Sequence, residues 1–102
     1  MSKKKYELRY LPSAEKDLLS IFEWIAVDSL PRARSFLEQL DNRIGGLASH
    51  PLLGRIPRDP RLQALGYRVL VIENHLVFYQ VRGRTVQLHR VVRGSRDLDA
   101  II

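Results

Sequence analysis

The sequence contains no cysteine, which excludes disulfide scaffolds, zinc ribbons, iron–sulfur sites and thiol nucleophiles. It also contains no apolar run approaching the ~20 residues that a membrane-spanning helix needs. Lys3, Lys4 and Lys5 make the amino terminus basic, but no apolar stretch follows them, so no targeting segment is predicted. We therefore expect a soluble, cytoplasmic protein that does not bind membranes.

Familiar catalytic motifs are missing as well. The chain has no GxSxG sequence, no glycine-rich phosphate loop and no cluster of carboxylates. Its three histidines, His50, His75 and His89, include no pair at the i,i+4 spacing of metal ligands. We expect neither a metal nor a cofactor. His89, predicted on a strand, qualifies as a general base only if it shares a face with Arg93 and an acid.

What the sequence does contain is enough apolar material for one domain, expected to span residues 1–102. A chain of 102 residues buries roughly 65% of the surface that its unfolded form exposes. Hydrophobic residues make up 45% of the chain, which argues against intrinsic disorder. No internal repeat or linker divides it.

The first half of the chain predicts a strand followed by two helices. Apolar and charged residues alternate over 6–10, Pro12 ends that strand, and Ser13 is a good N-cap for a helix. A short break at 28–31 separates two apolar stripes with helical spacing, which predict an antiparallel helical hairpin. The stripes consist of Ala14, Leu18, Ile21, Phe22 and Ile25, and of Ala33, Phe36, Leu37, Leu40, Ile44, Leu47 and Ala48.

The second half predicts a sheet. A loop over 50–63 leads to three β-like runs at 66–72, 76–81 and 85–92, which are joined by short turns. Short turns between such runs indicate an antiparallel meander. The order is β-α-α-β-β-β, so we predict an α+β fold in which the helical hairpin packs on an antiparallel β-sheet.

Charge gives the first indication of a partner. The net charge is +6, and 13 of the 17 cations are arginines, nine of them beyond residue 50 against four carboxylates. Arginine favours phosphate and carboxylate recognition, so the partner is a nucleic acid or an acidic protein; the alternative is charge that serves solubility alone. The candidates for a basic binding face are Arg55, Arg58, Arg61, Arg68, Arg93 and Arg96.

One arginine is expected to serve the structure instead. Alternation along the last strand places Arg90 on the same face as Val86, Leu88 and Val92, toward the helices. A buried guanidinium needs an acidic partner. We predict a structural ion pair with Asp17 on the first helix, and Asp97 is the alternative partner.

Leu19 and Trp24 lie on opposite flanks of the first helical stripe. Apolar residues outside a core stripe either border the core or contact a partner, and aromatic residues are common anchors in interfaces. Both are therefore candidate partner contacts.

In order and spacing, several segments resemble the RelE/ParE superfamily of type II toxin–antitoxin toxins over nearly the full length of the chain. The ending, with Gly94, Arg96 and Asp97, resembles the ParE branch, although Arg93 stands where that family usually has histidine. The similar segments are 6–10, 14–25, 33–47, 50–55, 66–70, 77–81 and 88–98.

This resemblance implies a RelE/ParE-like fold and a growth-arresting toxin of the kind that serves plasmid stabilization. The toxin would be neutralised by an acidic antitoxin, partly disordered when free, in a hetero-oligomer. ParE-like toxins inhibit DNA gyrase without catalysis, whereas RelE-like toxins are ribosome-dependent mRNA endonucleases. We expect Leu19 and Trp24 to contact the antitoxin. The target would be contacted by Arg58, Arg61, Arg68, Arg93 and Arg96.

The chain lacks most of the residues with which RelE-like toxins cleave RNA. Leu76 or His75 replaces an arginine of that set, Tyr67 and Val69 replace lysines, and the terminal aromatic residue is absent. We therefore predict a gyrase inhibitor that is not an enzyme. The alternative is an mRNA interferase (a ribosome-dependent endoribonuclease) with Arg68, His89 and Arg96 as its acid/base set, and a third reading is a non-toxic interaction module.

Overall fold

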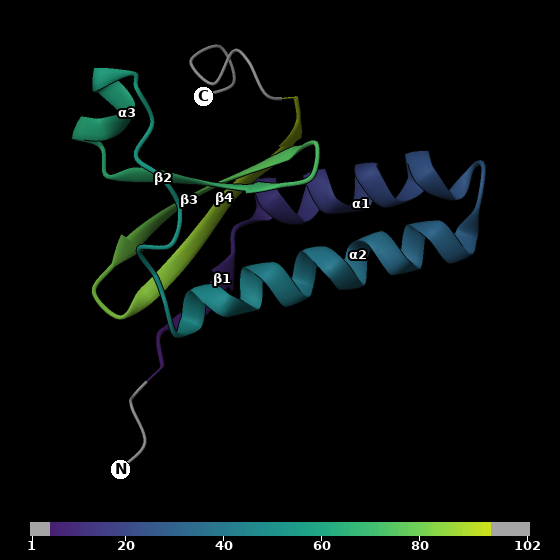
Figure 1. Cartoon of the computed structure of the whole chain (residues 1–102), viewed down its shortest axis with the longest axis horizontal. Helices are drawn as coiled ribbons and strands as arrows, with labels where there is room; N and C mark the ends of the chain where they lie inside the picture. Colours follow the sequence, from purple (N-terminus) through teal and green to yellow (C-terminus); the bar gives the residue numbers. More distant parts are fainter. Residues whose placement is uncertain (1–4, 95–102) are drawn as a thin grey trace.

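The computed structural model describes residues 5–94 and consists of two long helices packed against a four-stranded sheet (Figure 1). The predicted α+β fold with a helical hairpin on a sheet is confirmed. No helix in this part of the chain has the length and apolar character needed to cross a bilayer. The elements are β1 (Glu7–Tyr10), α1 (Pro12–Ala26), α2 (Leu30–Gly45), the 3₁₀ turn η1 (Gly46–Ala48), α3 (Pro60–Ala64), β2 (Tyr67–Ile72), β3 (His75–Arg82) and β4 (Thr85–Arg93).

The strands are ordered β1-β4-β3-β2. β2, β3 and β4 form the predicted antiparallel meander, but β1 pairs with β4 in parallel, with Glu7 opposite Thr85 and Tyr10 opposite Leu88. The sheet is therefore mixed and not antiparallel throughout. The parallel pair arises because the helical hairpin, the connection to β2 and the meander together form the crossover between these two strands.

Local sequence explains the helix boundaries, with one correction. In α2, the side chain of Ser29 accepts a hydrogen bond from the Arg32 amide at 3.3 Å, and proline occupies the first turn. α1 begins at Pro12, so Ser13 is inside the helix and the predicted N-cap is wrong. The Ser13 hydroxyl instead donates to the carbonyl of His89 at 2.6 Å, which makes it a tether between α1 and β4.

Apolar residues cover both faces of the sheet. The larger cluster lies between the sheet and the α1–α2 hairpin and includes Leu40, Ile44, Tyr79 and Leu88. The smaller cluster is formed by Leu62, Val69, Leu76 and Phe78. Leu62 comes from α3, a short helix within the segment predicted as a loop. α3 therefore contributes to the second layer of the core through Leu62. Full burial of a large apolar side chain of this kind stabilises the fold by roughly 1.5–3 kcal/mol.

A β-bulge interrupts the register between β3 and β4. Phe78 pairs with Arg90 and Tyr79 with Leu88, which leaves His89 as an extra residue on β4. An inserted residue reverses the faces of everything beyond it. Val91 therefore packs in the helix-side core, whereas Arg90, opposite Phe78, and Val92 lie on the other face, so the predicted placement of Arg90 and Val92 on the face of Leu88 is wrong.

Candidate functional site

The first turns of α1 continue the pairing of β4 where β1 ends. The Leu11 amide donates to the Leu88 carbonyl at 3.0 Å, and Ser13 follows with its bond to His89. One turn further on, the Asp17 carboxylate accepts from the Val91 amide at 2.9 Å. Beyond the end of β1, groups at the start of α1 thus bind the main chain of β4 in place of a neighbouring strand. These bonds fix α1 against the end of β4.

Asp17 also pairs with Arg90. Nε of Arg90 donates to Oδ2 of Asp17 at 2.7 Å, and Nη2 donates to Oδ1 at 3.2 Å. The Asp17 hydrogen bond raises the pKa of Arg90 above its usual value. Asp17 is 17% and Arg90 38% exposed, so the pair lies at the border of the core. The alternative partner, Asp97, lies outside the described residues.

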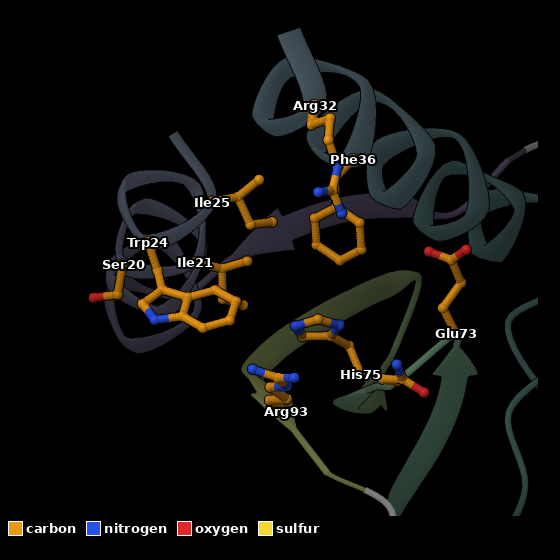
Figure 2. Close-up of a pocket in the computed structure, with 10 residues that line it drawn as sticks. Ser20, Ile21, Trp24, Ile25, Arg32, Phe36, Glu73, His75 and Arg93 are labelled. Atoms are coloured by element: carbon orange, nitrogen blue, oxygen red, sulfur yellow. The ribbon is translucent and has the colours of Figure 1, made fainter. Parts of the chain in front are cut away.

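A groove of about 580 Å³ lies between the helical hairpin and the β2–β3 turn. We call it the hairpin groove. As Figure 2 shows, the side chains of Ile21, Trp24 and Ile25 on α1 and Phe36 on α2 form its apolar walls, and charged side chains lie at its ends. Its residues are Ser20, Ile21, Trp24, Ile25, Arg32, Phe36, Glu73, Asn74, His75 and Arg93.

Trp24 and Arg93 meet at this groove. Trp24 is 64% exposed, and the Arg93 guanidinium carbon lies 4.8 Å from the centroid of its indole ring. A cation over an indole face is attracted by its π electrons. Trp24 therefore borders the groove with a large apolar surface beside a positive charge. Leu19, the other expected antitoxin contact, is 58% exposed on α1 but does not line the groove.

His75 lines the groove but was not among the predicted site residues. It was predicted in a turn but is the first residue of β3, and it is only 9% exposed. Its ring lies 4.7 Å from that of Phe36, and its Nδ1 has no hydrogen-bond partner among the described residues. Burial lowers the pKa of His75, Arg93 lowers it further, and Glu73 partly opposes these effects. The only sequence signal was its position just before the apolar run 76–81.

We expect the stability of the protein to fall as the pH drops below about 6.5, the usual pKa of an unfolded histidine. The folded state holds His75 neutral, whereas the unfolded chain takes up a proton there, so acid favours unfolding. One such group contributes a slope of at most about 1.4 kcal/mol per pH unit. Urea unfolding of His75→Gln should show a smaller acid loss than the wild type.

His89, whose pKa is also lowered by burial, leaves a residual slope in that variant. His50→Gln, at an exposed loop position, is the matched control and should retain the full acid dependence. Equal slopes for His75→Gln and the wild type would contradict the assignment.

Three of the arginines expected to form a basic face have separate partners. Arg61 is 78% exposed, and its Nη2 lies 2.7 Å from Oδ2 of Asp59, whose pKa the hydrogen bonds from Arg61 lower to about 2. Nη1 of Arg68 donates to the Gly54 carbonyl at 2.8 Å, and Arg93 lies over Trp24. Arg58 is exposed, and Arg96 lies outside the described residues. The structure therefore assigns Arg93 to the hairpin groove and Arg68 to a loop contact.

Two residues of the expected ribonuclease set, Arg68 and His89, contact different parts of the protein. Nδ1 of His89 lies 3.3 Å from the Tyr67 hydroxyl, and the two rings meet edge to face with centroids 5.0 Å apart. Nε2 of His89 is buried without a hydrogen-bond partner in the described part of the chain. Arg68 binds the loop, so these two residues have different partners. Over residues 5–94, no three histidine or carboxylate side chains gather in a metal-binding cluster.

Comparisons with a family model and with individual proteins indicate the same family. A family model described as the ParE toxin of the type II toxin–antitoxin system parDE matches residues 8–98. Toxin ParE1 of Mycobacterium tuberculosis, in strains CDC 1551 / Oshkosh and H37Rv, is 31% identical over 99 residues. The match covers 89% of this chain and 94% of that protein.

Two solved structures share the fold. The chromosomal ParDE toxin–antitoxin system of P. aeruginosa gives a TM-score of 0.75 at 21% identity and covers 91% of this chain and 100% of that one. The RelBE2 toxin–antitoxin complex of Mycobacterium tuberculosis gives 0.62 at 18% identity and covers 87% and 98%, respectively. At these identities, the likeness concerns the fold alone.

Proposed function

Because this chain belongs to the ParE toxin family of type II toxin–antitoxin systems, we propose that it arrests growth by inhibiting DNA gyrase in the cytoplasm. The observation that carries the proposal is the family match over residues 8–98. Gyrase is chosen because the chain resembles the ParE branch and lacks most residues of the RelE-type cleavage set. The inhibition would be by binding and not by catalysis.

The hairpin groove is the proposed contact for the antitoxin. It offers apolar walls, the exposed ring of Trp24, and the guanidinium groups of Arg32 and Arg93. An acidic segment with bulky apolar side chains complements both features, since aromatic anchors and charge pairs carry much of the energy of interfaces. The solved structures that share the fold come from toxin–antitoxin systems, which supports a partner of this kind.

Two experiments test the proposed activity. Induction of the chain alone should arrest growth of a bacterial host, and the purified protein should inhibit supercoiling by purified gyrase. Relaxation of the same plasmid by topoisomerase I at equal protein concentration is the control and should be unaffected. Normal supercoiling together with new mRNA cuts at ribosomal A sites would favour the mRNA endonuclease instead. An induced chain without any growth defect would favour the non-toxic interaction module.

A further inference from the structure

Residues 51–66, which we call the edge segment, lie between η1 and β2 and include α3 (Figure 1). Before α3, the segment pairs with the edge strand β2 at Val69. Main-chain hydrogen bonds of 2.9 Å in both directions join Arg55 to Val69. The Arg68 side chain holds the Gly54 carbonyl from the same strand. The edge segment is therefore attached to β2 by one antiparallel bridge and by the Arg68 side chain.

A buried tyrosine fixes the start of the edge segment. Tyr79 is fully buried on β3, and its hydroxyl donates to the Pro51 carbonyl at 2.8 Å and accepts from the Gly54 amide at 2.8 Å. At the other end, Nε2 of Gln80 donates to the Leu65 carbonyl at 2.6 Å. Core side chains thus hold the main chain of the edge segment at both ends.

Although its main chain is fixed, the edge segment turns large apolar side chains outward. They do not contribute to either core cluster. A rigid main chain that displays apolar side chains has already lost the entropy that binding would otherwise cost, and such exposure indicates an interaction surface. The side chains are Leu52, Leu53, Ile56 and Leu65, between 54% and 62% exposed.

The charge of the edge segment indicates the chemistry of the partner. Arg55, Arg58 and Arg61 are exposed, whereas its single carboxylate, Asp59, is buried and paired with Arg61. The surface is therefore both apolar and positive. Phosphate backbones are bound mainly by cations, while exposed leucine and isoleucine beside arginine suit a protein partner with acidic residues around an apolar patch.

We propose that the edge segment is the surface through which this protein binds its protein target, at an acidic and partly apolar site on that target. None of its residues lines the hairpin groove, so the target and the antitoxin would bind different faces. This inference rests on the proposed function, which supplies gyrase as the target to be tested.

The test compares two pairs of exposed apolar residues. Leu53→Ser with Ile56→Ser removes apolar surface from the edge segment, and Val27→Ser with Leu30→Ser removes it from the tip of the helical hairpin, where both residues are exposed. Binding to immobilised gyrase should weaken about tenfold or more for the edge variant and by less than about twofold for the tip variant. Thermal unfolding of both variants should match the wild type. If the wild type binds gyrase, equal affinity of a folded edge variant would overturn the inference.

Growth arrest separates this inference from the choice of gyrase. If the wild type arrests growth without inhibiting gyrase, the proposed target is wrong, but the edge variant should still lose growth arrest and the tip variant should keep it. If the wild type neither arrests growth nor inhibits gyrase, the proposed function and the inference are both wrong. The inference is also overturned if Arg55→Gln with Arg58→Gln abolishes growth arrest, Leu53→Ser with Ile56→Ser does not, and the wild type binds a short DNA duplex in fluorescence anisotropy.

Discussion

Replacement of Asp17 with alanine is expected to lower the free energy of unfolding by about 3 kcal/mol, because hydrogen bonds to charged groups contribute roughly 1.5–3 kcal/mol each and several are lost here. The Asp17 carboxylate accepts two bonds from Arg90 and one from the Val91 amide. The partial exposure of Arg90 lets water replace part of this loss, which keeps the total well below the simple sum. Urea unfolding measures the change.

Two further variants make the Asp17 prediction specific. Glu23→Ala, at an exposed position of the same helix, is the matched control and should change stability by less than about 0.5 kcal/mol. In a double-mutant cycle, Asp17→Ala and Arg90→Ala should not be additive, because each removes the same ion pair. An Arg90→Ala protein with unchanged stability would show that the pair contributes nothing to folding.

Replacement of Gly54 with valine is expected to cost about 3 kcal/mol, since overpacking costs 1–3 kcal/mol and hydrogen bonds are lost with it. A Cβ atom at this position would lie 2.7 Å from both Cε1 and Oη of Tyr79 and 3.0 Å from the Val69 carbonyl carbon. The fully buried Tyr79 ring has no room to move, so the edge segment must detach from β2. Amide hydrogen exchange at Arg55 and Val69 should then become faster.

The control for Gly54→Val is Gly45→Ala, because a Cβ atom at Gly45 meets nothing within 4 Å. Alanine is more favourable than glycine inside a helix by up to about 1 kcal/mol, so this variant should be as stable as the wild type or more stable. Tyr79→Phe, which removes only the hydroxyl, should cost about 2 kcal/mol, because the buried Gly54 amide and the Pro51 carbonyl both lose their partner. A Gly54→Val protein of wild-type stability would contradict the close contact with Tyr79.

Sequence patterns predicted the order of the elements but not how β4 is placed. Val91 and Val92 are both apolar, so alternation alone does not reveal that an extra residue at His89 exchanges their faces. The four residues of β1 do not show that this strand pairs in parallel, because its partner β4 is distant in the chain. α3 was missed although Asp59 and Pro60 are good helix-start residues, since its five residues are too few to show a periodic apolar stripe.

Part of the site was predictable from single physical rules. A buried cation requires an acid nearby, and this rule selected Asp17 as the first candidate for Arg90 and Asp97 as the alternative. The pair with Asp17 is present, but the bulge places Arg90 on the face opposite to Leu88, and its side chain is 38% exposed. Exposure of Trp24 followed from its position outside the apolar stripe. Arg68 and Arg93 were assigned by charge alone, and charge does not reveal that one binds a loop carbonyl and the other an indole ring. Residues of α1, α2, the β2–β3 turn, β3 and β4 together line the hairpin groove, and no local sequence pattern predicts that they meet.

The contacts along the margins of the sheet also bear on aggregation. Unpaired strand margins can recruit strands from other copies, and proteins resist this with short, charged or covered outer strands. Here β1 is four residues long and exposes Glu7 and Arg9, α1 covers β4 beyond β1, and the edge segment covers β2 at Val69. When no partner is bound, the edges of the sheet are thus protected from pairing with strands of other copies.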